Sequence, residues 1–203
     1  MTDLASSTLV LATHNAGKVK EIKARLVHLP YEIVPIHHYS THAPEETGKT
    51  FIENAIIKAR FACQKSGLPA LADDSGLIVD ALAGAPGVNS ARFAGDHVSG
   101  DMHNTKLLSL MTDVPSQQRT ARFVCVLVLL ESVDDPMPVI FQGCLEGSIL
   151  SEPQGEGGFG YDPVFYIPRM KCTAAQLTDQ QKANCSHRGQ ALDQFLKWID
   201  KKG

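Results

Sequence analysis

The stretch that decides the fold runs from Ala121 to Glu131 and reads "ARFVCVLVLLE". It is almost continuously apolar, and most of its residues are β-branched, aromatic or leucine. A strand with one face in water alternates polar and apolar residues, whereas an unbroken apolar strand is covered on both faces. The stretch therefore predicts a central strand. Residues 139–150, which follow the turn residues Pro136 and Pro138, predict its hairpin partner.

Near the N-terminus a short buried strand is expected over Thr8–Thr13 ("TLVLAT"), and a helix follows it directly. Asn15 is suited to cap this helix, because its side-chain oxygen can accept from the first-turn N–H groups. The apolar residues at helical spacing then predict one buried face. These residues are Val19, Ile22, Leu26 and Leu29.

A second helix is predicted by "TFIENAIIKARFACQKSG", where Thr50 and Glu53 have the spacing of a capping box. Gly67 provides its C-terminal stop. Asn54 and Lys58, four residues apart, are expected to project together on the side opposite the buried face. That buried face comprises Ile52, Ala55, Ile56, Ala59 and Ala62.

The remaining elements complete an α/β protein built around a long mixed sheet. Strands and helices intermingle along the chain, which favours this class over separate all-α and all-β regions. Further strands are expected over residues 31–36, 69–72, 76–79 and 164–167, and further helices over 102–111, 174–184 and 187–201, with Ser186 capping the last.

Composition places the chain among ordinary globular proteins and excludes some function classes. It has 203 residues, of which 43% are hydrophobic and 20% charged, with a net charge of −3. This balance argues against a general nucleic-acid coat or a membrane-surface binder. The apolar run Leu9–Ala12 is too short for a secretory signal and follows an acid, Asp3; no segment is long enough to span a bilayer. Five cysteines without a C-x-x-C pair indicate neither a zinc knuckle nor a disulfide framework, as expected in a reducing cytoplasm.

The turn between the first strand and the first helix has the character of an anion site. N–H groups at a helix N-terminus and the positive end of the helix dipole attract phosphate. The side chains of Thr13 and Asn15 add hydrogen-bonding groups, and Lys18 adds a full charge. The phosphate loop G-x-x-x-x-G-K-[ST] is absent. The alternative interpretation is a plain cap followed by a solvated lysine.

Two pairs of carboxylates indicate a metal site. Asp73 and Asp74 stand at the end of an expected strand in "LADDSGLIVD", and Glu45 and Glu46 precede the second helix. Carboxylate oxygens suit Mg²⁺, which needs one or two of them together with phosphate oxygens. No His or Cys accompanies them, which disfavours zinc. Taken separately, each pair is consistent with a solvated loop or an Asx turn; together with a phosphate-binding turn, they predict a Mg²⁺–phosphate pocket.

Two segments near the C-terminus contain groups that can recognise a base. The loop "GEGGFGYDP" lets the backbone approach a ligand closely, and Phe159 and Tyr161 within it offer stacking surfaces. Asp162 precedes a proline and is therefore expected to be extended. In "KANCSHRGQAL" a lysine, an imidazole and a guanidinium surround a helix start. No G-x-S-x-G elbow supports a serine hydrolase there. The alternative for the glycine loop is a mobile loop with a buried Phe.

Five blocks occur in a familiar order: "LATHNAGKVKEI", "EETGKTFIENAIIKAR", "ADDSGLIVDALAGAPGVNSARFAG", "GGFGYDPVF" and "SHRGQAL". The chain closely resembles the inosine triphosphate pyrophosphatase family, most of all the bacterial dITP/XTP pyrophosphatases. The likeness extends from about Thr8 to the C-terminus.

This resemblance implies a single α/β domain over residues 1–203, with two lobes and an active-site cleft between them. It implies a cytoplasmic homodimer that neither binds nucleic acid directly nor associates with a membrane. The implied reaction is Mg²⁺-dependent hydrolysis of ITP, dITP and XTP to the monophosphate and pyrophosphate, which keeps these nucleotides out of DNA and RNA.

The resemblance also implies roles for individual residues. Asp74 resembles the catalytic acid and metal ligand, and Glu45 or Glu46 is the companion ligand. Our hypothesis is that Asp74 helps deprotonate a water that attacks the α-phosphorus, while Lys18 offsets phosphate charge. Donors at the start of the last helix would pair with the purine 6-carbonyl. The implied substrate contacts are Thr13, His14, Asn15, Ala16, Gly17, Lys18, Ser75, Phe159, Gly160, Tyr161, Asp162, Lys182, His187 and Arg188.

Two alternatives stay open on the sequence. One is a related pyrophosphatase that acts on pyrimidine or canonical nucleotides. The other is a nucleotide-binding sensor without catalytic activity. The presence of the carboxylates together with the lysines argues against the sensor, because binding alone does not require a carboxylate that activates water.

Overall fold

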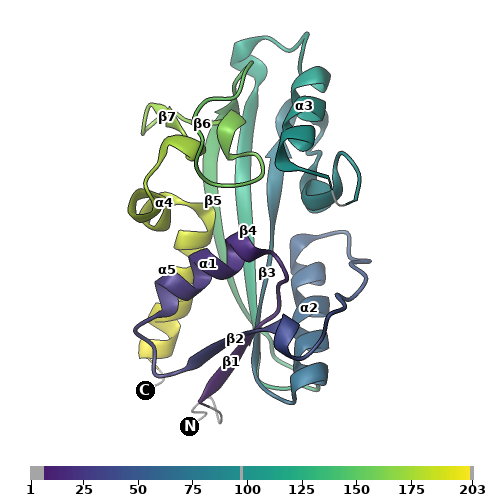
Figure 1. Cartoon of the computed structure of the whole chain (residues 1–203), viewed down its shortest axis with the longest axis vertical. Coiled ribbons are helices and arrows are strands. Elements are labelled where there is room, and N and C mark those ends of the chain that lie inside the picture. The colour runs from purple at the N-terminus through teal and green to yellow at the C-terminus, as the bar shows by residue number, and fades with distance from the viewer. Residues whose placement is uncertain (1–6, 97, 202–203) are drawn as a thin grey trace. The chain divides into compact units, whose positions relative to one another are not determined.

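The computed structural model describes residues 7–96 and 98–201 (Figure 1). Asp3, which counts against a secretory signal, lies outside the described residues. The strands form one mixed sheet of seven in the order β2-β1-β3-β4-β5-β6-β7, with β1 parallel to β2 and β3, and β6 antiparallel to β5 and β7. The strands are β1 Thr8–Leu11, β2 Glu32–Pro35, β3 Ala70–Val79, β4 Thr120–Leu130, β5 Val139–Ile149, β6 Phe165–Ile167 and β7 Cys172–Thr173.

Five α-helices accompany the sheet in the described part of the chain, so the predicted α/β class and mixed sheet are confirmed. Among the described residues no helix combines the length and the apolar character that crossing a bilayer requires. The helices are α1 Ala16–Leu26, α2 Phe51–Ser66, α3 Gly100–Leu110, α4 Asp179–Cys185 and α5 His187–Asp200.

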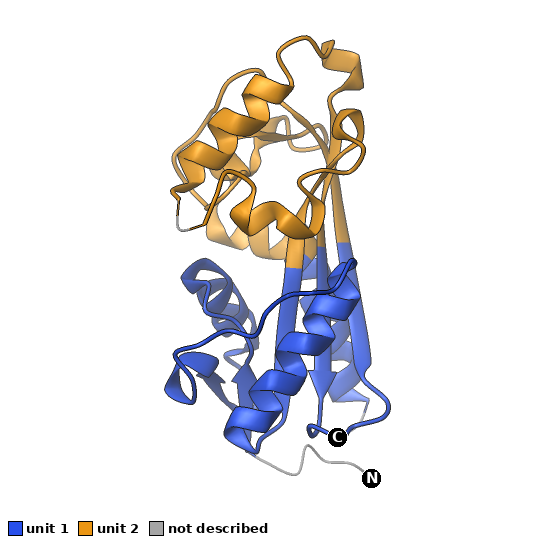
Figure 2. Ribbon diagram, turned by 90° about the vertical axis from the view of Figure 1, so that its right-hand side faces the viewer, with its two compact units in different colours: residues 1–74, 125–143, 188–203 blue, residues 75–124, 144–187 orange. Residues whose placement is uncertain are grey.

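The chain divides into two compact units (Figure 2). The first comprises residues 1–74, 125–143 and 188–203, and the second comprises residues 75–124 and 144–187. The boundaries fall inside β3, β4 and β5, so each of these strands contributes to both units. The first unit contains α1, α2 and α5 from Arg188 onward, and the second contains α3, α4 and His187, the first residue of α5.

In the first unit, β4 is covered on both faces, as its unbroken apolar sequence predicts. Alternate residues Cys125, Leu127 and Leu129 join the core with α1 and α5. The residues between them, Val126, Val128 and Leu130, join a second core with α2. Successive strand side chains point to opposite faces, so one strand can supply two cores only when every position is apolar.

The second unit has a core of its own, built from the other halves of the long strands. Phe123 of β4 packs against Phe165 of β6, with ring centroids 4.3 Å apart. Leu107 and Met111, from α3 and its C-terminal end, are fully buried in the same cluster. This core supports the glycine-rich loop that precedes β6.

The helix that follows Thr50 has the predicted ends. Thr50 and Glu53 form the capping box, and Gly67 adopts a left-handed conformation with φ +69°. Asn15 likewise caps α1, where its side chain accepts from the backbone N–H of Lys18. These predictions are confirmed because each depends on residues within one turn of the helix end.

Three predictions of local structure are wrong. The Asp-Asp-Ser segment is not a turn between two strands, because β3 runs unbroken from Ala70 to Val79; the buried carboxylates have cationic partners, which removes the need for water. Asp162 is not extended but begins a 3₁₀ helix. The helix expected over 174–184 is a 3₁₀ turn and a separate α4, because Thr178 forms a new capping box with Gln181.

Candidate active site

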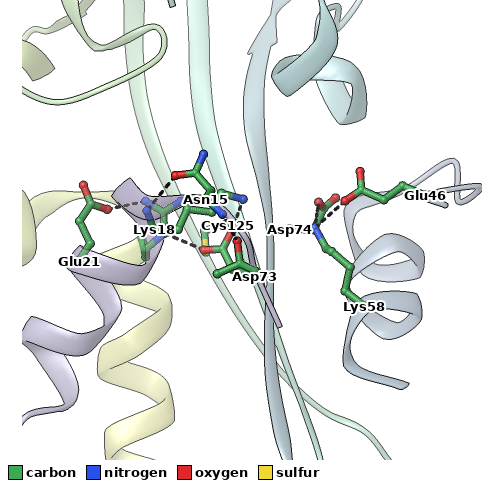
Figure 3. Close-up of polar contacts among 10 residues, drawn as sticks. Asn15, Lys18, Glu21, Glu46, Lys58, Asp73, Asp74 and Cys125 are labelled. Atoms are coloured by element: carbon green, nitrogen blue, oxygen red, sulfur yellow. Dashed lines mark hydrogen bonds and ion pairs between the residues drawn. The ribbon is translucent and has the colours of Figure 1, made fainter. Parts of the chain in front are cut away.

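Asp73 and Asp74 are neighbours in β3, and their side chains point to opposite faces of the sheet (Figure 3). On one face Asp73 meets Lys18 of α1. On the other face Asp74 meets Lys58 of α2. The alternation of a strand thus separates two adjacent carboxylates into two different clusters within the first unit.

Asp73 is the centre of a buried ionic cluster. Its side chain is fully buried; Oδ1 lies 2.5 Å from the Lys18 Nζ, and Oδ2 lies 2.7 Å from the Arg188 Nε. The Cys125 thiol donates to the same Oδ2 at 3.4 Å. Burial alone would raise the pKa of Asp73, but the charges of Arg188 and Lys18 outweigh it and hold the pKa well below its ordinary value. Asp73 is therefore an anion at neutral pH, and it anchors a residue from each of two helices.

Arg188 is buried in the same cluster, between two carboxylates. Its Nη1 lies 2.5 Å from the Glu21 Oε2, in addition to the contact of its Nε with Asp73. Burial would lower the pKa of Arg188, but the charge of Asp73 outweighs it, so the pKa is raised. The described contacts of the guanidinium are thus ionic, and its role as a base contact stays a prediction.

Asp74 faces a different cation and keeps one oxygen unsatisfied. Lys58 donates to Oδ1, and the same Nζ lies 3.0 Å from the Glu46 Oε1. Oδ2 is buried and has no hydrogen-bond partner among the described residues. Burial raises the pKa of Asp74, against the opposing charges of Lys58 and Lys18. A buried carboxylate oxygen without a donor needs a ligand to satisfy it.

Lys58 lies at the candidate site, although the sequence pattern places it on the side of its helix opposite the buried face. Asn54 and Lys58 were expected to project away from the core, but Asn54 is fully buried and Lys58 reaches Asp74. The reason is that the loop before α2 folds back over the helix: the Gly48 N–H donates to Asn54 Oδ1 at 2.8 Å, and the Lys49 N–H donates to Glu53 at 2.8 Å. The i,i+4 spacing of two polar residues beside a capping box was the available signal.

The carboxylates suit a divalent cation of the Mg²⁺ type. Asp74 offers the unsatisfied Oδ2, and Glu46 contacts Lys58, the lysine that also contacts Asp74. Glu45 is exposed. The described part of the chain contains no group of three or more His, Cys, Asp or Glu side chains arranged to hold a metal. Mg²⁺ does not require such a cage, because it keeps waters and takes one or two carboxylates with phosphate oxygens.

The predicted phosphate-binding turn has the expected local structure. The Asn15 N–H donates to the Thr13 hydroxyl at 3.2 Å, and the Lys18 N–H donates to Asn15 Oδ1 at 3.1 Å. The His14 ring contacts the Ser40 carbonyl oxygen, 3.1 Å from its Nε2. Ala16 and Gly17 form the first residues of α1. Anion binding by this turn stays a prediction.

In the second unit, the glycine-rich loop is organised around Asp162. Asp162 is buried, and its Oδ2 accepts from the Phe159 N–H at 2.8 Å and from the Lys182 Nζ at 2.7 Å. The same Nζ lies 4.7 Å from the centroid of the Phe159 ring. A Cβ on Gly158 would stand 2.1 Å from Asp162 Oδ2, so only glycine fits there. Lys182, which the sequence places in a different segment, thus joins Phe159 and Asp162 of the loop in one cluster.

Three further residues that the sequence predicts as substrate contacts are buried or lie within a strand. Tyr161 is buried, and its hydroxyl donates to the Ser90 carbonyl at 2.8 Å. His187 is buried and stacks on Phe123 with ring centroids 4.9 Å apart. Ser75 lies half-buried within β3. Their contacts with a substrate stay predictions.

Comparisons with known proteins bear on the whole chain. The Ham1 family model matches residues 9–198. A dITP/XTP pyrophosphatase of Photobacterium profundum is 53% identical over 190 residues, which are 94% of this chain and 96% of that protein. A solved structure of a HAM1 protein from Coxiella burnetii superposes with a TM-score of 0.89 at 46% identity, and covers 96% of this chain and 98% of that one.

A third comparison shows the same fold in a more distant relative. The crystal structure of a nucleoside-triphosphatase / dITP/XTP pyrophosphatase from Mycobacterium abscessus has a TM-score of 0.75 at 38% identity, with 93% of this chain and 98% of that chain covered. The resemblance that the five sequence blocks indicate is confirmed over nearly the full length. The chain belongs to the Ham1 family.

Proposed function

We propose that the protein is a nucleoside triphosphate pyrophosphohydrolase that converts ITP, dITP and XTP to the monophosphate and pyrophosphate. In the cell this reaction would remove non-canonical purines from the nucleotide pool before they enter DNA or RNA. Relatives named dITP/XTP pyrophosphatase match nearly end to end. The observation that carries the proposal is the buried Asp74. Its Oδ2 has no hydrogen-bond partner among the described residues, while its Oδ1 pairs with Lys58, which also contacts Glu46.

We propose Mg²⁺ as the cofactor, held by Asp74 and by Glu46 as the companion ligand. Support for Glu46 over Glu45 comes from its contact with Lys58, which it shares with Asp74. When bound, a cation of this kind offsets phosphate charge and lowers the pKa of a coordinated water.

Within this site, the Asp74 carboxylate is the group proposed to accept a proton from the attacking water. Water adds to the α-phosphorus, the bond from that phosphorus to the bridging oxygen breaks, and pyrophosphate leaves with the bond's electrons. Lys58 holds the Asp74 carboxylate in place and favours its ionised form. Lys18 adds positive charge toward the phosphates, since its ammonium has three donors and Asp73 accepts from one.

Base selection is proposed to depend on hydrogen bonding to the purine 6-carbonyl. Hypoxanthine and xanthine carry an acceptor there, whereas adenine carries an amino donor. Donors at the His187–Arg188 start of α5 would pair with the carbonyl and lose their partner with adenine. Each buried donor left unsatisfied costs about 1–3 kcal/mol, so two or three discriminate strongly. The Phe159 ring is the proposed stacking surface.

The reaction is tested by identifying its products. With ITP in ¹⁸O-labelled water, phosphorus NMR should show IMP and pyrophosphate, with the label in IMP, because water attacks the α-phosphorus. IDP and orthophosphate as the products, or label in pyrophosphate, would contradict the proposed chemistry. A protein that binds ITP without any turnover would support the sensor instead.

We propose further that residues 1–203 act as one α/β domain with two lobes, as a cytoplasmic homodimer. The support is the resemblance to the inosine triphosphate pyrophosphatase family. Light scattering after gel filtration should give twice the mass of the chain, and the mass of one chain would contradict the dimer.

A further inference from the structure

In the second unit, α3 contacts the glycine-rich loop through Asn104. This side chain is buried, with 4% exposed, and its Nδ2 donates to the Gly160 carbonyl at 3.1 Å. Gly100, at the start of α3, packs on the same residue: a Cβ added there would lie 3.6 Å from the Gly160 Cα. The helix therefore holds the loop at a residue between Phe159 and Tyr161.

The backbone of the loop is conformationally free at Gly160 unless a contact restrains it. Its φ of +62° lies in the left-handed region, which glycine adopts freely and from which it can also leave freely. On the N-terminal side, Phe159 is fixed by the bond from its N–H to Asp162. The Asn104 bond fixes the carbonyl of Gly160. Together the two bonds restrain the backbone on either side of the peptide that joins Phe159 to Gly160.

We propose that Asn104 is a positioning residue for purine binding, acting through the Gly160 carbonyl to fix the Phe159 stacking surface. The inference rests on the proposed function, since it presumes that this loop binds the base. Asn104 Oδ1 is buried and has no hydrogen-bond partner among the described residues. The amide of Asn104 is therefore oriented by the hydrogen bond from its Nδ2 to the Gly160 carbonyl. Nothing in the site chemistry of Asp74 and Lys18 involves this residue.

The isosteric variant Asn104→Asp tests the proposal. It replaces the donor with a carboxylate oxygen that faces the Gly160 carbonyl, so an attraction becomes a repulsion at unchanged volume. We expect the KM for ITP and the inhibition constant of IMP to rise about fivefold to tenfold, the loss of one hydrogen bond. The inhibition constant of pyrophosphate should stay unchanged, because pyrophosphate has no base. The charge-matched control is Asn89→Asp, at an exposed position.

A second variant separates positioning from a general loss of structure. Gly160→Ala places a Cβ where no atom lies within 4 Å, so it strains the loop backbone without a clash. If Asn104 acts through Gly160, the increases in KM from the two substitutions should not multiply in the double variant. Thermal unfolding of each variant gives the fraction that is folded at the assay temperature, so that KM is compared among folded molecules.

The outcomes distinguish this inference from the proposed function. Wild-type protein that fails to hydrolyse ITP would refute the function itself. Wild-type activity with an unchanged KM in Asn104→Asp would overturn the inference alone. A lower kcat at constant KM, with equal losses for IMP and pyrophosphate, would also overturn it, because that pattern indicates a merely structural role. A rise in KM and in the IMP constant, with pyrophosphate unaffected, would support the positioning role.

Discussion

Asp73 and Asp74 differ because the alternation of β3 gives each carboxylate its own set of cations. Asp73 is paired with Lys18 and Arg188, and its pKa is held well below the ordinary value. Asp74 is paired with Lys58, and burial raises its pKa. The first carboxylate is suited to anchor the helices, and the second is suited to exchange a proton.

The variant Asp74→Asn tests the catalytic role. The amide keeps the shape of the side chain but can neither accept a proton from water nor bind a cation strongly. We expect turnover of ITP to fall by about 10²- to 10⁴-fold, the contribution of a general base. The melting temperature should stay near that of the wild type. The control is Asp113→Asn at an exposed position. Near-normal turnover in Asp74→Asn would remove this residue from the mechanism.

The variant Asp73→Asn should have a lower free energy of unfolding than the wild type, in addition to any loss of activity. It removes the carboxylate that the buried Arg188 shares with Lys18, and leaves Glu21 as the described countercharge of the guanidinium. Removing one partner of a buried ion pair typically costs about 3–5 kcal/mol in the free energy of unfolding. The folded pKa of Asp73 is depressed, so its stabilising contribution is present above the unfolded value of about 3.9 and is lost as the pH falls through the folded value.

Urea unfolding in metal-free buffer at several pH values measures this contribution. The difference between wild type and Asp73→Asn should be largest near about pH 7 and should shrink below about pH 4. A difference that stays constant over that range would show that the Asp73 charge does not stabilise the fold.

Lys58 is expected to set the acidic limit of activity. Burial would lower the pKa of Lys58, but Asp74 and Glu46 outweigh this and raise it, so the residue stays a cation. In Lys58→Met the pKa of Asp74 should rise further, because one of the charges that lower it is gone. The acidic limb of the kcat/KM profile should then move to higher pH. Lys65→Met, on the same helix but exposed, is the control; equal profiles for both variants would contradict the role.

At the scale of elements, α2 connects a local sequence signal to the site. Its capping box does more than begin the helix, because Glu53 also accepts from the Lys49 N–H and so holds the preceding loop. Asn54 accepts from the Gly48 N–H in the same loop. This loop carries Glu46, so the N-terminus of α2 determines where the proposed companion carboxylate lies.

Two glycine substitutions at opposite ends of α2 test this connection. In Gly48→Ala the new Cβ would lie 2.6 Å from Asn54 Oδ1, so the loop must move. We expect kcat/KM to fall at least about tenfold, the effect expected of a misplaced ligand. In Gly67→Ala the Cβ meets no atom within 4 Å, but φ is +69°. That strain costs about 1–2 kcal/mol of stability, and activity per folded molecule should be unchanged. Equal activity losses in both variants would contradict the assignment.

The elements also show what the sequence can and cannot predict. Ends of α1 and α2 are predictable because their caps involve neighbours within one turn. The unbroken β3 and the contact of Lys58 with Asp74 are not, because they depend on partners 16 to 115 residues away, such as Arg188 for Asp73. Propensity rules disfavour Asp in a strand. They cannot anticipate the buried countercharges that stabilise Asp73 and Asp74 there.

At the scale of the whole molecule, the residues proposed to act on the substrate are divided between the two units. The first unit contains the carboxylates, Lys58 and the strand-to-helix turn at Asn15. The second contains Asp162, Lys182 and the glycine-rich loop. The family match covers both units, from residue 9 to residue 198. Since neither unit contains all of the predicted contacts, we expect turnover to require the intact chain.

The most direct test is pyrophosphate release from ITP, XTP, dITP, ATP and GTP, each with Mg²⁺ and with a chelator. We predict fast release from the first three with Mg²⁺. Release from ATP should be slow because adenine lacks the 6-carbonyl, and release from GTP should be slow because guanine, which shares that carbonyl, must be rejected through its 2-amino group. All turnover should be lost in chelator. Equal turnover of ATP would contradict the proposed base selection, and equal turnover in chelator would contradict the proposed cation at Asp74. The absence of pyrophosphate release from every nucleotide would refute the central claim that the protein is a pyrophosphohydrolase.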